Sequence, residues 1–178
     1  LYAIGKDLHL SPLVLILVCG LLLNNTHLLR RVRPLNGLLR PGYDVTLRER
    51  GFGEFEGLTW AEVEEHHPDA SRRWRERDAG FGPPGGETLA AFYQRALDAL
   101  AAIAARHRGQ HIAIVTHGGV LDVLYRAASR IALDAPRTWQ LGNASINRVL
   151  HGERGFTLVG WNDGFHLEGD DPLDEASA

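Results

Sequence analysis

The sequence predicts an α/β domain, on the strength of two apolar strand-like runs and one junction between a strand and a helix. Residues 13–18 form a continuous apolar run, as central strands buried on both faces do. Residues 111–116 form a second run, and His-Gly-Gly at 117–119 follows it directly. Because a strand that passes through glycines into a helix is the repeating unit of α/β folds, these observations together favour that class.

Between these runs, capping signals predict two short helices and a loop. Thr59 followed by Glu62 forms a capping box, so a helix should begin at the next residue, Trp60. Pro68 is suited to the first turn of another short helix, which we expect to run through Trp74. The stretch 81–86 is rich in glycine and proline and is expected to be a loop.

The rest of the chain predicts two helices and a hairpin. We expect a helix over 120–129, and a hairpin in which 146–150 and 156–161 flank a Gly-Glu-Arg-Gly turn. Residues 88–106 predict a long helix because their apolar positions recur at helical spacing. These positions are Leu89, Phe92, Ala96, Leu97, Leu100 and Ile103.

Length and patterning indicate a single domain over residues 1–167. Within it, residues 1–46 are atypical, because apart from the apolar run they lack regular patterning. Residues 168–178 are acidic and without periodicity, and we expect this tail to be disordered.

Charge and composition exclude several classes of protein. A net charge of -3 gives no reason to expect a nucleic-acid partner. The apolar run ending at Leu23 is too short to span a bilayer, so no membrane association is expected. The single cysteine, Cys19, fits a reducing, cytoplasmic location. The nine histidines show no metal-ligand spacing, so we predict no metal and no other cofactor. Oligomeric state is left open.

His117 is the first candidate functional residue. It leaves the carboxyl end of a predicted buried strand, where ligands bind in open α/β sheets. The helix that follows presents free N–H groups and a positive dipole end, both suited to phosphate, and Gly118 lets a ligand approach the backbone. A histidine that only caps the helix beside a tight turn is the alternative.

The segment 47–57 is the second candidate, because acids and arginines alternate there with small and aromatic residues. A carboxylic acid near a phosphate, such as Glu49, is able to protonate a leaving alkoxide. A solvated charged loop is the alternative. Glu87, in Pro-Gly-Gly-Glu-Thr, is a weaker candidate. It is equally explained as an acidic residue that stabilises the first turn of the next helix.

Together these segments resemble the histidine phosphatase superfamily, also called phosphoglycerate mutase-like. The resemblance runs from about residue 47 to 161 and faintly back to Arg30, and it is nearest to small bacterial phosphatases similar to α-ribazole phosphatase. It depends on LRERGFGEFEGLTWAEV at 47–63, PPGGET at 83–88 and IVTHGGVLDVLY at 114–125, which stand in the family's order.

The resemblance implies a three-layer α/β/α fold and hydrolysis of a small phosphomonoester through a phosphohistidine, without metal. It implies that Glu49 is the general acid and base and that His117 is the second, phosphate-binding histidine. Arg30 is the candidate for a phosphate-clamping arginine, and Glu87 is expected to serve local structure or to contact substrate. Asn143 and Asn147 fall where the family often adds polar groups near the site.

The family's nucleophile motif, Arg-His-Gly, does not occur in this sequence; after the apolar run the chain continues with Cys19-Gly20. Cys19 is not followed by the Cys-x5-Arg pattern of cysteine phosphatases, and neither His9 nor His27 has Arg-His-Gly around it. Three alternatives stay open. The first 46 residues differ from the native sequence, the gene is a truncated remnant, or the chain is a non-catalytic relative that binds phosphorylated ligands.

Overall fold

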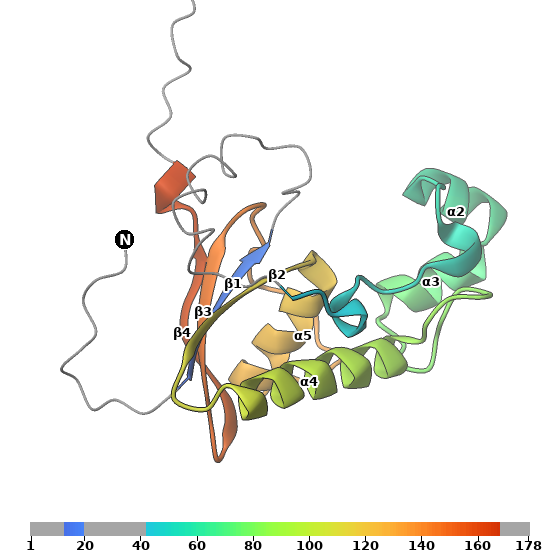
Figure 1. The fold of residues 1–178 in the computed structure, drawn as a ribbon. Coiled ribbons are helices and arrows are strands. Elements are labelled where there is room, and N and C mark those ends of the chain that lie inside the picture. Colours follow the sequence, from blue (N-terminus) through green and yellow to red (C-terminus); the bar gives the residue numbers. More distant parts are fainter. Residues whose placement is uncertain (1–12, 20–41, 168–178) are drawn as a thin grey trace, which may run out of the picture.

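The computed structural model describes residues 13–19 and 42–167, and it confirms the predicted α/β architecture (Figure 1). Each predicted helix and strand forms close to its predicted bounds. The strands are β1 (Leu13–Cys19), β2 (His111–Thr116), β3 (Ile146–Gly152) and β4 (Gly155–Asp163); the helices are α2 (Trp60–His66), α3 (Pro68–Arg75), α4 (Leu89–Arg106) and α5 (Gly118–Ser129); short 3-10 turns are η2 (Val45–Leu47), η3 (Gly53–Phe55) and η4 (Phe165–Leu167).

The sheet has the strand order β2-β1-β3-β4, with β1 parallel to β2 and antiparallel to β3. Its register pairs Cys19 with Thr116 and Val18 with Ile146. The carboxyl ends of β1 and β2 therefore lie side by side at the same end of the sheet. His117 follows Thr116 at this end, as the sequence predicts for a ligand site.

One face of the sheet packs against α4 and α5 (Figure 1). Along β2 the exposure alternates, with Ile114 and Thr116 buried and Val115 on the opposite face 53% exposed. From α4, five residues at helical spacing are buried in this core: Leu89, Phe92, Ala96, Leu100 and Ala104.

The opposite face of the sheet has no helix over it among the described residues. Val115 and Val159 are both more than half exposed. Within residues 13–19 and 42–167, the structure thus shows two of the three layers that the family resemblance implies.

The α2–α3 pair lies beyond the amino end of α4 and has a small core of its own, formed by Phe55, Val63 and Phe81 (Figure 1). A buried ionic network joins its end to α5. Asp122 accepts hydrogen bonds from Arg77 Nη2 at 2.9 Å and from Arg126 Nε at 2.8 Å.

No helix in the described part of the chain has the length and apolar character needed to cross a membrane.

Candidate functional site

Leu47 fixes the loop that carries Glu49 against the end of β2. Its side chain is 7% exposed and belongs to the main core. The Thr116 hydroxyl, which is also buried, donates a hydrogen bond to the Leu47 carbonyl oxygen at 2.9 Å. A core side chain and a strand-end hydroxyl thus hold the backbone two residues before Glu49, so this loop is an ordered part of the site.

The half-buried carboxylate of Glu49 is bound by two backbone N–H groups. Gly119 N–H donates to Oε2 at 2.9 Å, and Arg50 N–H donates to Oε1 at 2.9 Å. Glu49 therefore lies at the first turn of α5, two residues beyond His117. The structure brings together the two residues that the sequence offers as catalytic candidates, although nearly 70 positions separate them.

His117 occupies the N-cap position of α5 with an extended backbone, φ -102° and ψ 163°. Its exposed side chain makes no capping hydrogen bond to the helix, so the imidazole does not serve as a cap. The first N–H groups of any helix lack intrahelical partners, and the helix dipole favours an anion there. The histidine and the amino end of α5 together are chemically suited to bind a phosphoryl group.

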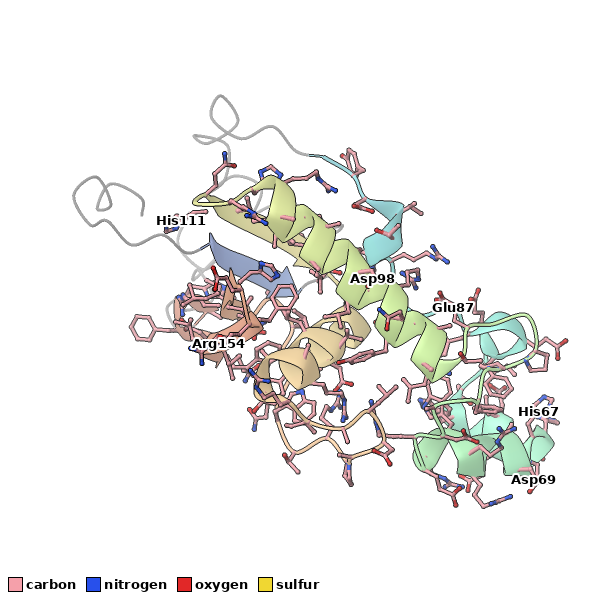
Figure 2. All side chains as sticks on the ribbon, turned by 90° about the horizontal axis from the view of Figure 1, so that it is seen from below. His67, Asp69, Glu87, Asp98, His111 and Arg154 are labelled. Carbon is pink, nitrogen blue, oxygen red and sulfur yellow. The ribbon has the colours of Figure 1, made fainter. Side chains whose placement is uncertain are left out.

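Glu87 lies just before α4, whose N-cap is Thr88, so it is not an acid of the helix's first turn (Figure 2). Arg95 holds its carboxylate with two contacts, Nε to Oε1 at 2.7 Å and Nη2 to Oε2 at 2.6 Å. Gly51 N–H donates to Oε2 at 3.0 Å. The hydrogen bonds from Arg95 lower the pKa of Glu87. Glu87 therefore fastens the start of α4 to the loop after Glu49.

Arg95 also binds the Glu49 loop directly, which the sequence did not predict. Its Nη1 donates to the carbonyl oxygens of Thr46 at 2.6 Å and Arg48 at 3.3 Å. The guanidinium thus bridges the Glu87 carboxylate and the backbone on either side of Leu47. In the sequence, Arg95 has only the helical spacing of an ordinary surface residue of α4.

Arg50 is a second supporting arginine that the sequence did not reveal. It is 8% exposed, and its guanidinium donates to the carbonyl oxygens of Glu87 at 3.0 Å and Phe81 at 2.8 Å. It also lies over the Trp74 ring, 4.1 Å from the centroid. Burial lowers the pKa of Arg50 to about 10. The alternation of charges around Glu49 thus includes an arginine that faces the interior.

The two asparagines lie in different surroundings. Asn143 is exposed in the turn before β3. Asn147 is fully buried; its Oδ1 accepts from Asn162 N–H at 2.8 Å, and its Nδ2 donates to Ser145 Oγ at 3.2 Å. In the sheet register Asn147 pairs with Leu17, two residues from the carboxyl end of β1. Its side chain ties β3 to the end of β4.

Of the other predicted phosphate contacts, Gly118 is the first residue of α5, and a Cβ built on it meets nothing within 4 Å. The space beside its backbone is therefore open to a ligand. Arg30 lies outside the described residues. Across the described ranges, no three side chains of histidine, cysteine, aspartate or glutamate gather as a metal would require.

A family model described as the histidine phosphatase superfamily (branch 1) matches residues 29–164. The chain belongs to this superfamily. The match spans the Glu49 loop, the α4 start and the β2–α5 junction, so the resemblance inferred from three short motifs is confirmed over most of the chain.

Individual similar proteins show how far the likeness extends. A metal-independent phosphoserine phosphatase of Arabidopsis thaliana is 35% identical over 122 residues, which are 68% of this chain and 50% of the relative. The structure of Bacillus stearothermophilus YhfR has a TM-score of 0.65 at 29% identity, covering 83% of this chain and 73% of that one. The chain spans about half the length of the curated relatives it matches.

The α-ribazole phosphatase of Shigella flexneri is also among the structural relatives. Its TM-score is 0.64 at 23% identity, with 83% of this chain and 72% of that chain covered. At this level of identity the likeness is one of fold, and it confirms the phosphoglycerate mutase-like architecture.

Proposed function

We propose that this chain binds the phosphoryl group of a small phosphomonoester at the β2–α5 junction and hydrolyses the ester. The position of the Glu49 carboxylate at the first turn of α5, beside His117, is the observation that supports this most strongly. In this proposal His117 and the amino end of α5, including Gly118 N–H, hold the phosphoryl oxygens. Positive groups placed there stabilise the charge on those oxygens in the transition state.

Glu49 is the proposed general acid and base. A leaving alkoxide is a strong base, so a proton delivered as the P–O bond breaks lowers the barrier. The same group then removes a proton from the water that completes hydrolysis. By family resemblance this passes through a phosphohistidine, which divides the reaction into two steps.

The substrate is proposed to be a small phosphorylated molecule and the reaction to need no metal. The printed name of the Arabidopsis relative, a metal-independent phosphoserine phosphatase, supports both points. Arg30, Asn143 and Asn147 remain proposed contributors to the site. The single cysteine supports a cytoplasmic location.

A second candidate function is binding of a phosphorylated ligand without turnover. The observation that favours it is the absence of Arg-His-Gly from the sequence. The phosphoryl-binding part of the site requires no nucleophile, so this candidate uses His117 and the start of α5 unchanged.

Hydrolysis of p-nitrophenyl phosphate and of phosphoserine in the presence of EDTA separates the two candidates. The phosphatase proposal expects turnover by the wild-type chain and a loss of about 100-fold or more in kcat/KM for His117→Ala. Saturable phosphate binding without turnover would contradict the phosphatase proposal and support the binding function. Folded protein that neither turns over nor binds phosphate would exclude both.

A further inference from the structure

Among the described residues, Gly119 is the only residue of α5 whose backbone donates a hydrogen bond to the proposed general acid. Its N–H donates to Glu49 Oε2 at 2.9 Å. Because the second carboxylate oxygen accepts from Arg50 N–H, both Glu49 oxygens are oriented by backbone donors. Two backbone donors fix the plane of a carboxylate more firmly than two mobile side chains would, since the backbone does not change rotamer.

The space beside Gly119 is filled by the Glu49 carboxylate. A Cβ built at residue 119 meets Glu49 Oε1 far inside van der Waals contact, Glu49 Cδ at 2.9 Å and Phe92 Cζ at 3.0 Å. At Gly118, one residue earlier, a Cβ meets nothing within 4 Å. Of these two adjacent glycines, only Gly119 has the general acid in the space that a side chain would fill.

We infer that Gly119 is a positioning residue for Glu49, acting through both its N–H and its lack of a side chain. The inference rests on the proposed phosphatase function. A methyl group at 119 would displace the carboxylate from the start of α5, where the leaving-group oxygen would receive its proton. The atoms first displaced are the flexible end of a glutamate, whereas the Phe92 ring, at 3.0 Å, has to shift by only a few tenths of an ångström. Alanine also favours a helix more than glycine does. The substitution should therefore move the acid while the fold is retained.

The proton transfer gives this role a specific kinetic signature. As the nucleophile's bond to phosphorus forms, the P–O bond to the leaving group breaks and its electron pair stays on the leaving oxygen. The proton passes from the Glu49 carboxyl to that oxygen, which leaves Glu49 as a carboxylate. An alkoxide such as that of phosphoserine needs this proton, whereas p-nitrophenolate is stable without it.

The decisive variant is Gly119→Ala, assayed with phosphoserine and with p-nitrophenyl phosphate. The ratio kcat/KM reports the steps up to departure of the leaving group and leaves out the later attack of water, which is common to both substrates. Because general acid catalysis is worth about 100-fold or more, we expect kcat/KM for phosphoserine to fall at least tenfold and kcat/KM for p-nitrophenyl phosphate to fall less than threefold. Gly118→Ala is the comparator: any effect on phosphate binding or on the helix changes both rates together, so the ratio of the two should stay at the wild-type value. Equal losses for both substrates in folded Gly119→Ala would overturn the inference.

An NMR measurement tests the same contact without turnover. In ¹H–¹⁵N spectra of the full chain, Glu49→Gln should shift the Gly119 amide proton more than that of Gly118, because it removes the charge from the acceptor. A Gly119 amide proton unaffected by Glu49→Gln would overturn the inference. If wild-type protein turns over neither substrate, the phosphatase proposal fails, while this measurement still decides whether Gly119 orients Glu49.

Discussion

Replacing Glu87 by glutamine separates the two roles that the sequence left open for this residue, local structure and substrate contact. Glutamine keeps the shape of the side chain but removes the charge that Arg95 binds at 2.7 and 2.6 Å. Each hydrogen bond to a charged group contributes about 1.5–3 kcal/mol, and the two side chains are only 17% and 20% exposed. For the pair we expect Glu87→Gln to lower the free energy of unfolding by about 2–4 kcal/mol.

Urea unfolding at pH 7 measures this loss, with Glu64→Gln as the matched control. Glu64 pairs with Arg75 at 2.8 Å, but both side chains are more than half exposed. An exposed ion pair contributes about 0–1 kcal/mol, so the control should differ little from wild type.

The difference in unfolding free energy between wild type and Glu87→Gln should change with pH in a predictable direction. The hydrogen bonds from Arg95 lower the pKa of Glu87 in the folded state. The carboxylate's contribution is therefore complete above the unfolded pKa of about 4.3 and is lost as the pH falls through the lower folded value. The stability gap between wild type and Glu87→Gln should be widest near pH 7 and close in acid. A variant as stable as wild type at pH 7 but with a raised KM would refute the structural role and make Glu87 a substrate contact.

Three further substitutions are expected to destabilise the fold, each measured by urea unfolding. Asp122→Asn removes the ionic partner of the fully buried Arg126 and should cost about 3–5 kcal/mol. Thr116→Val leaves the Leu47 carbonyl oxygen without its buried donor and should cost about 1–3 kcal/mol. Gly53→Ala places a side chain where φ is +53° and should cost at least about 1–2 kcal/mol.

Matched substitutions at exposed positions control for the residue change itself. The controls are Thr157→Val and Gly152→Ala. Thr157 is exposed on β4, and Gly152 has open space where a Cβ would lie and no positive φ. Surface changes of this kind stay within about 0.5 kcal/mol of wild type. Losses no larger than those of the controls would contradict the contacts assigned to Thr116 and Gly53, and Glu64→Gln serves Asp122→Asn in the same way.

The elements that the sequence predicted well are those set by local chemistry. The capping box at α2 is present as expected: Thr59 N–H donates to Glu62 Oε2 at 2.7 Å and Glu62 N–H donates to Thr59 Oγ1 at 3.3 Å. The sequence predicts the start of α5 at Val120, two residues later than the structure has it. Glycine is a poor helix former, so propensity argues against a helix there. In the fold, the hydrogen bond between Gly119 and Glu49 and the packing of the turn override that preference.

The supporting residues of the site could not be predicted, because their partners are distant in sequence. Arg95 contacts backbone atoms 46 to 49 positions away, and its partner Glu87 lies eight residues earlier, before the helix begins. Arginine is a residue type usually found on the surface, but Arg126 is fully buried against Asp122. Hydrophobic periodicity carries no information on such ion pairs, because it marks an arginine as solvent-facing.

The candidate site was predictable only in parts. Spacing alone marked His117 and Glu49 as separate candidates, each with an unremarkable alternative. Their placement together depends on the hydrogen bond from Gly119 to Glu49, which spans 70 positions. In the sequence, the only feature that links the two residues is the order of the three family motifs.

Phosphate titration of ¹⁵N-labelled protein tests most directly that the β2–α5 junction is a phosphoryl-binding site. The account predicts saturable shifts of the Gly118 amide and of the His117 imidazole, and a clear weakening of binding in His117→Ala. Shifts that are absent from these groups, or that persist unchanged in His117→Ala, would contradict it.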